Sequence, residues 1–101
     1  MGKPAVVTGW SANTEFCKPD NSILIPFELK RPTGGSKYDS LNNNAVTRWA
    51  EPDVDAAATA LRRLYRNEEE RLRIGECARR FMRDYFSIEN FKRSMERFLS
   101  A

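Results

Sequence analysis

The fold is decided by two short apolar stretches near the start of the chain, residues 4–9 (PAVVTG) and residues 22–26 (SILIP). Each is a continuous run of aliphatic and β-branched residues that ends at glycine or proline. Such a run is typical of a strand buried on both faces of a parallel sheet, whereas a half-exposed strand alternates. Parallel neighbours need a crossover, and the about twelve residues between the stretches are just enough for one. We therefore predict two short parallel strands in a strand–turn–strand unit over residues 1–26.

The next segment, residues 27–50, has the composition of a loop. It is rich in glycine, proline, serine and asparagine, with GGS at residues 34–36 and NNN at residues 42–44. A connection longer than about 12–15 residues is usually functional or flexible. We predict a long loop over this segment.

Residues 51–101 change to the periodicity of helices. Pro52 suits a first helical turn, Asn67 precedes three glutamates that favour a helix start, and Ser87 is a typical N-cap. Apolar residues spaced by three and four predict three amphipathic helices with inward-facing stripes. The stripes are Val54, Ala57, Ala58, Leu61, Leu64 and Tyr65; Leu72, Gly75, Ala78, Phe81, Met82 and Tyr85; and Ile88, Phe91, Met95, Phe98 and Leu99.

Composition restricts the classes of function. The 101 residues include 17 basic and 14 acidic side chains, a formal charge of +3, and no histidine. This length predicts one domain. The missing histidine excludes histidine-based triads and histidine-ligated zinc. No apolar run is long enough for a signal peptide or a membrane span, so we expect a cytoplasmic protein in which Cys17 and Cys77 are reduced thiols.

The turn after the first predicted strand carries the candidate binding residues. In open α/β sheets, ligands bind outside the carboxyl ends of the strands. We expect Gly9 to let the backbone approach a ligand, and Ser11 and Asn13 to hydrogen-bond it. Glu15 would accept hydrogen bonds from sugar hydroxyls, and Trp10 lies near the same ligand. The alternative is a plain turn with a solvated glutamate.

Four blocks of this sequence resemble one enzyme family, the retaining GT-B glycosyltransferases of group 1, or family 4. Residues 2–16 (GKPAVVTGWSANTEF) are similar to its stretch G-K-P-V-V-A-T-x-x-x-G-N-x-E-F, and residues 21–26 (NSILIP) to the next strand, N-S-x-L-V-P. Residues 49–57 (WAEPDVDAA) resemble W-A-E-P-D-x-x-x-A, a helix start found in one branch. Residues 71–79 (RLRIGECAR) resemble R-x-x-x-G-x-x-A-R. The four blocks occur in the family's order and span nearly the whole chain.

The resemblance implies an α/β fold that is a partial Rossmann-like unit, two short parallel strands followed by a long loop and three amphipathic helices. In that family a nucleotide sugar binds this domain, and two glutamates seven residues apart lie just before G-K-P. Met1 falls where that Glu-x7-Glu motif ends, so we expect one truncated unit over residues 1–101 without the motif or the acceptor domain. Ala12 stands where the family often has glycine.

We therefore expect a glycosyltransferase-like fragment that is non-catalytic alone, with no catalytic residue, metal or cofactor and at most weak nucleotide-sugar binding. Parallel strands that have lost a neighbour expose an apolar edge. We accordingly expect self-association, most simply a homodimer that joins strand edges or shares helices. The alternative is a monomer with a rearranged fold, in which the loop over residues 26–49 or the C-terminal helix folds back over the edge.

A nucleic-acid- or protein-binding helical module is the alternative. It would use the arginine-rich helices, whose arginines are Arg62, Arg63, Arg66, Arg71, Arg73, Arg79, Arg80 and Arg83. Residues 51–101 nevertheless hold eleven basic against ten acidic residues. At helical spacings this balance favours a solvated, ion-paired face, and a phosphate-binding face is less balanced. Nucleic acid is therefore not the expected partner.

Overall fold

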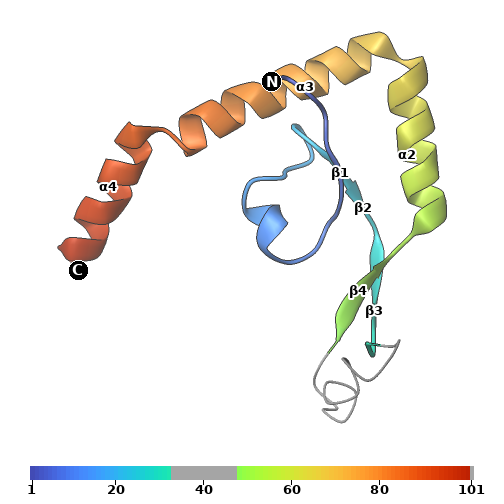
Figure 1. Cartoon of the computed structure of the whole chain (residues 1–101), viewed down its shortest axis with the longest axis horizontal. Helices are drawn as coiled ribbons and strands as arrows, with labels where there is room; N and C mark the ends of the chain where they lie inside the picture. The colour runs from blue at the N-terminus through green and yellow to red at the C-terminus, as the bar shows by residue number, and fades with distance from the viewer. Residues whose placement is uncertain (33–47, 101) are drawn as a thin grey trace.

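The computed structural model describes residues 1–32 and 48–100, and it contains both helices and strands (Figure 1). Strand β1 (Val6–Thr8) pairs in parallel with β2 (Ile23–Ile25), with Val6 opposite Ile23 and Thr8 opposite Ile25. A short 3₁₀ helix, η1 (Ser11–Glu15), lies in the connection between them. The two predicted parallel strands are confirmed.

The prediction of a loop over residues 27–50 is wrong at both of its ends. Strand β3 (Phe27–Lys30) pairs antiparallel with β4 (Trp49–Pro52), so that Phe27 faces Pro52 and Lys30 faces Trp49. Residues 27–30 (FELK) alternate apolar and polar, the period of a strand, and all four are exposed. Residues 33–47, the middle of the predicted loop, lie outside the described residues.

Three helices follow, as predicted: α2 (Val54–Arg66), α3 (Glu68–Tyr85) and α4 (Ile88–Leu99). Each begins at a side chain that accepts a hydrogen bond from a backbone N–H of the first turn. Asp53 Oδ1 accepts from Ala56 at 2.9 Å, Asn67 Oδ1 from Glu70 at 3.0 Å, and Ser87 Oγ from Asn90 at 3.1 Å.

The predicted place of Pro52 in the first helical turn needs correction. Pro52 is the last residue of β4, and Asp53 is the N-cap of α2. At the end of a strand the missing N–H of proline removes little from the ladder.

The corner between α2 and α3 is fixed by side chains of α3. Arg71 Nη1 donates to the carbonyls of Leu64 at 2.8 Å and Tyr65 at 3.2 Å, which are among the last carbonyls of α2 without partners inside the helix. Arg63 and Glu70 form an ion pair across the same corner at 2.9 Å. These contacts connect the two helices where one ends and the next begins.

The buried core of the described residues is small and lies where α2 and α3 meet the parallel strands. Its apolar members are Cys17, Ile25, Ala60, Leu64 and Ile74. The predicted inward stripes are only partly inward: Val54, Leu61 and Tyr65 on α2 are exposed, and α4 has no buried residue. The α2 stripe was wrong in part because Ala60 and Leu64, rather than Leu61 and Tyr65, lie on the contacting side.

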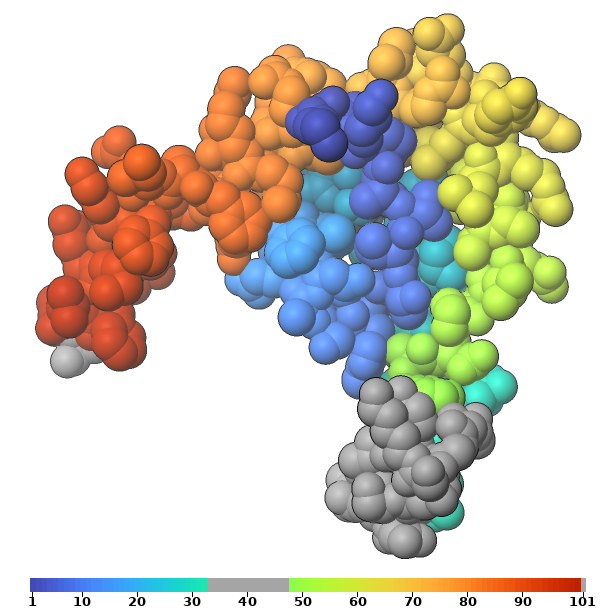
Figure 2. Space-filling view, in the orientation of Figure 1, coloured from blue at the N-terminus to red at the C-terminus, as the bar shows by residue number. Residues whose placement is uncertain are grey.

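The molecule is flat and open. It measures 48 × 44 × 18 Å with a radius of gyration of 17.7 Å, whereas a compact domain of about 100 residues has a radius near 13 Å. Helix α4 projects away from the strands at one end of the molecule (Figures 1 and 2). The apolar side of α4 is consequently left uncovered by the rest of the described chain.

Candidate functional site

The candidate turn leaves the carboxyl end of β1, where Gly9 continues the strand pairing. Its N–H donates to the Ile25 carbonyl at 3.0 Å, and the next N–H, of Trp10, donates back to the Thr8 carbonyl at 2.8 Å. A Cβ built on Gly9 would lie 3.4 Å from the Leu24 Cβ, which is an ordinary contact. Gly9 therefore lies against β2 and hydrogen-bonds it, and these contacts do not direct its backbone toward a ligand.

Ser11 and Asn13 shape the turn itself. Ser11 is exposed and has a φ of 69°, in the left-handed region that residues other than glycine enter at a cost. Asn13 Nδ2 donates to the Thr8 carbonyl at 3.0 Å and so ties η1 to the end of β1. Asn13 Oδ1 is buried and accepts no hydrogen bond from the described residues. The turn thus holds one strained hydroxyl-bearing residue and one unused acceptor.

Trp10 and Glu15 point to different neighbours. The Trp10 ring packs against Phe27 of β3, with ring centroids 5.2 Å apart and planes at 56°. Glu15 Oε1 accepts a hydrogen bond from the Tyr85 hydroxyl on α3 at 2.7 Å. This bond to the carboxylate stabilises the neutral phenol and raises the pKa of Tyr85 above its usual value. The structure thus brings Ser11 and Asn13 together at the turn and holds Trp10 and Glu15 to either side.

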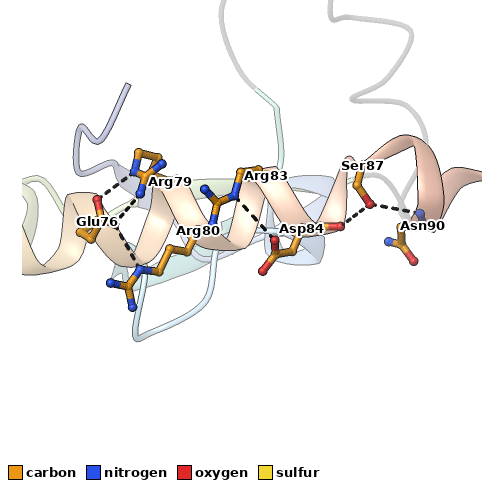
Figure 3. Close-up of polar contacts among 7 residues, drawn as sticks. All are labelled: Glu76, Arg79, Arg80, Arg83, Asp84, Ser87 and Asn90. Atoms are coloured by element: carbon orange, nitrogen blue, oxygen red, sulfur yellow. Dashed lines mark hydrogen bonds and ion pairs between the residues drawn. The ribbon is translucent and has the colours of Figure 1, made fainter.

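A groove beside Glu15 was not predicted from the sequence. It has a volume of about 630 Å³ and lies where η1 meets the junction of α3 and α4. Its polar lining is formed by Glu15, Tyr85, Ser87, Asn90, Ser94 and Arg97. Asn90 Nδ2 donates to the Tyr85 carbonyl at 2.7 Å, and Ser87 Oγ donates to the Asp84 carbonyl at 2.9 Å, the latter drawn in Figure 3. No sequence signal indicated it, because Tyr85 reads as one member of an apolar stripe.

The charged face of α3 is organised around Glu76 (Figure 3). Its carboxylate accepts from Arg79 Nη2 at 2.6 Å and Nε at 2.9 Å, and from Arg80 Nε at 3.1 Å. The hydrogen bonds from Arg79, supported by the one from Arg80, lower the pKa of Glu76 to about 2. Arg83 and Asp84 form a further ion pair at 3.8 Å. This pairing favours the interpretation of these arginines as a solvated face.

The described residues also limit the other site chemistries. Within residues 1–32 and 48–100, no three cysteine, aspartate or glutamate side chains gather closely enough to hold a metal ion. No helix in the same ranges is long and apolar enough to cross a bilayer. Cys17 is buried, Cys77 is half-buried, and the two are not joined by a disulfide in the structure.

Comparisons of the chain with models of protein families, with curated proteins and with solved structures find no match. The sequence motifs and the geometry of the turn are therefore the features that bear on function.

Proposed function

We propose that this chain is a glycosyltransferase-like unit that binds a nucleotide sugar weakly at the turn after β1, does not transfer the sugar alone, and self-associates. The carrying observation is the placement of the exposed Ser11 beyond the carboxyl end of a parallel strand. Ligands of open α/β sheets bind at this end, and hydroxyl and amide groups suit sugar hydroxyls. The four sequence blocks that resemble the GT-B family support the same proposal.

The charged side chains near the turn have opposite effects on a pyrophosphate, so we expect weak binding. Lys18, which has the opposite sign of charge, lies close to the turn because its Nζ donates to the Thr14 carbonyl at 2.6 Å. Glu15, on the other side, is engaged by Tyr85 and carries the same sign of charge as a pyrophosphate. Sugar transfer also gains its rate from holding donor against acceptor, and the described residues of the turn form only one side of such a site.

Self-association is supported by the exposed apolar surface and by the strand edges. Within the described chain, the four strands form two separate two-stranded sheets, so each sheet has open edges. Most of the strongly exposed apolar side chains of the described residues lie on α2 and α4. Contact with a partner surface would remove exposed apolar side chains and open strand edges from water.

The test follows backbone amide signals by NMR while uridine, adenosine or guanosine diphosphate sugars are added to the full chain. We expect shifts confined to residues 9–15, which Ser11→Gly weakens, because glycine keeps the left-handed backbone and removes the hydroxyl. Asp20→Asn, outside the turn, serves as the matched control and leaves the shifts unchanged.

The same samples, given a labelled nucleotide sugar with Mg²⁺ or Mn²⁺, should show neither transfer nor hydrolysis. Turnover by the chain alone, or an absence of shifts with all three nucleotide series, contradicts the proposal.

A further inference from the structure

We infer that the apolar face of α4 is the surface through which two copies of this chain form a twofold dimer. The inference rests on the self-association in the proposed function and identifies its contact surface. It starts from the spacing of Ile88, Phe91, Met95 and Phe98, which are separated by three, four and three residues. This is the spacing at which two helices pack side chains into each other along a common seam.

The face is uncovered within the described chain. Phe91 is 65% exposed and Phe98 is 76% exposed, and no residue of α4 is buried. With Ile88, Met95 and Leu99 on the same helix and Phe86 just before it, the patch holds six exposed apolar side chains. At their exposed fractions they present roughly 800 Å², which is about what each partner buries in a standard protein interface. Monomeric proteins rarely leave a patch of this size in water.

The shape of the molecule favours a second copy as the occupant. Helix α4 projects from the end of the flat molecule, away from the strands (Figures 1 and 2). In an antiparallel pair related by a twofold axis, Ile88 faces Phe98 of the second copy and Phe91 faces Met95. The opposed helix dipoles of such a pair attract.

The charges on α4 agree with pairing to itself. Glu89 and Glu96 alternate with Lys92, Arg93 and Arg97, so neither sign dominates the helix. Two copies therefore meet without the repulsion of two surfaces of one sign. An anionic lipid surface, by contrast, selects amphipathic helices whose polar face is strongly basic.

The first experiment measures the mass of the full chain by light scattering over a series of concentrations. We expect the wild type to reach twice the monomer mass, and the α4 double variant Phe91→Ser/Phe98→Ser to keep the monomer mass throughout. Both phenylalanines are exposed, so this variant should keep its fold, which circular dichroism checks. The matched control, Leu61→Ser/Tyr65→Ser, removes two exposed apolar side chains of α2 and should still dimerise.

Three outcomes overturn the inference. The α4 double variant could keep the doubled mass, which would assign the contact to another surface such as a strand edge. The wild type could remain a monomer at every concentration. The wild type could also sediment with anionic vesicles while the α4 double variant does not, which would make the apolar face of α4 a membrane contact.

A second experiment is independent of any loss of stability. In a Cys17→Ala/Cys77→Ala background, Ser94→Cys places a thiol beside the seam near the middle of α4, where the two copies approach. We expect oxidation to link it into a disulfide-bonded dimer. Arg93→Cys, on the opposite side of the same helix, should link several-fold less, and equal linking of the two variants contradicts the inference.

The nucleotide-sugar titration on the α4 double variant separates the two proposals. Shifts at residues 9–15 in a monomeric variant support both. An absence of those shifts in both the wild type and the variant, while the wild type still dimerises, overturns only the nucleotide-sugar part of the proposed function. A wild-type monomer that still shows the shifts overturns only the dimer.

Discussion

Gly75 is the residue at which one methyl group has the largest expected effect on the fold. It is buried on α3, and a Cβ built on it would overlap the Gly2 carbonyl, because the N-terminal segment crosses the helix there. Gly2 itself has a φ of +67°. The absence of a side chain at Gly75 therefore allows the N-terminal segment to lie against α3.

Gly75→Ala should lower the free energy of unfolding by about 1–3 kcal/mol, the usual cost of overpacking a filled site. If the site at Gly75 were open, alanine would instead stabilise the helix by about 0.5–1 kcal/mol. The sign of the change in the free energy of unfolding therefore distinguishes a filled site from an open one. Urea denaturation measures it. In a chain without residues 1 and 2, Gly75→Ala should stabilise the protein. If the substitution lowers the free energy of unfolding equally in the full and the shortened chain, the overlap with Gly2 is contradicted.

The depressed pKa of Glu76 determines how its contribution to folding stability changes with pH. Its folded pKa is about 2, below the reference value of 4.5, because Arg79 and Arg80 hydrogen-bond the charged form. A carboxyl with a depressed folded pKa stabilises the protein above its unfolded pKa and loses this contribution as the pH falls through the folded value. The contribution of Glu76 is therefore present at pH 7 and is lost between pH 4.5 and about 2.

Glu76→Gln should accordingly lower the thermal midpoint at pH 7, and the difference from wild type should shrink as the pH falls through that window. Thermal unfolding followed by circular dichroism over a pH series measures the difference. Glu89→Gln is the control, since Glu89 is an exposed glutamate without an ion pair in the described ranges. A constant difference across the pH series would show that the ion pairs of Glu76 do not contribute to stability.

At the scale of elements, substitutions on α2 show which side of this helix packs into the core. Leu64 is 6% exposed and Leu61, one turn away on the same helix, is 59% exposed. Leu64→Ala should cost about 2–5 kcal/mol because it leaves a cavity beside α3. Leu61→Ala should change stability by about 0.5 kcal/mol or less, since it removes exposed surface. Urea denaturation of the two variants measures both costs, and equal costs would place the contacting side of α2 elsewhere.

The elements predicted correctly are those with local signals. Ser87 caps a helix as expected, and the helix predicted to start around Asn67 begins there, because a helix start depends only on the cap and the first turn that follows it. The pairing of β3 with β4 was missed because it joins segments on either side of a long stretch with the composition of a loop. The exposed side of α2 was partly missed because periodicity identifies an apolar stripe but does not say how much of it another element covers.

The candidate site also has a part that local sequence predicts and a part that it does not. The turn after β1 was predicted from adjacent residues, and the structure places Gly9, Ser11 and Asn13 on it. The bond between Glu15 and Tyr85 joins residues 70 positions apart, so no local pattern could predict it or the groove beside it. That bond bears on the proposed nucleotide-sugar binding because it engages Oε1 of the Glu15 carboxylate.

At the scale of the whole molecule, the open shape makes a prediction that is separate from dimer formation. The monomeric variant Phe91→Ser/Phe98→Ser should give a radius of gyration near 17.7 Å by small-angle X-ray scattering, whereas a compact fold of this length gives about 13 Å. The reason is that the variant lacks two of the large apolar side chains of α4, so folding α4 back onto the strands would bury less apolar area. Dilution below the dimerisation range should bring the wild type to the same radius. A radius near the compact value would mean that α4 packs on its own chain, and the apolar face proposed for the second copy would then be covered from within.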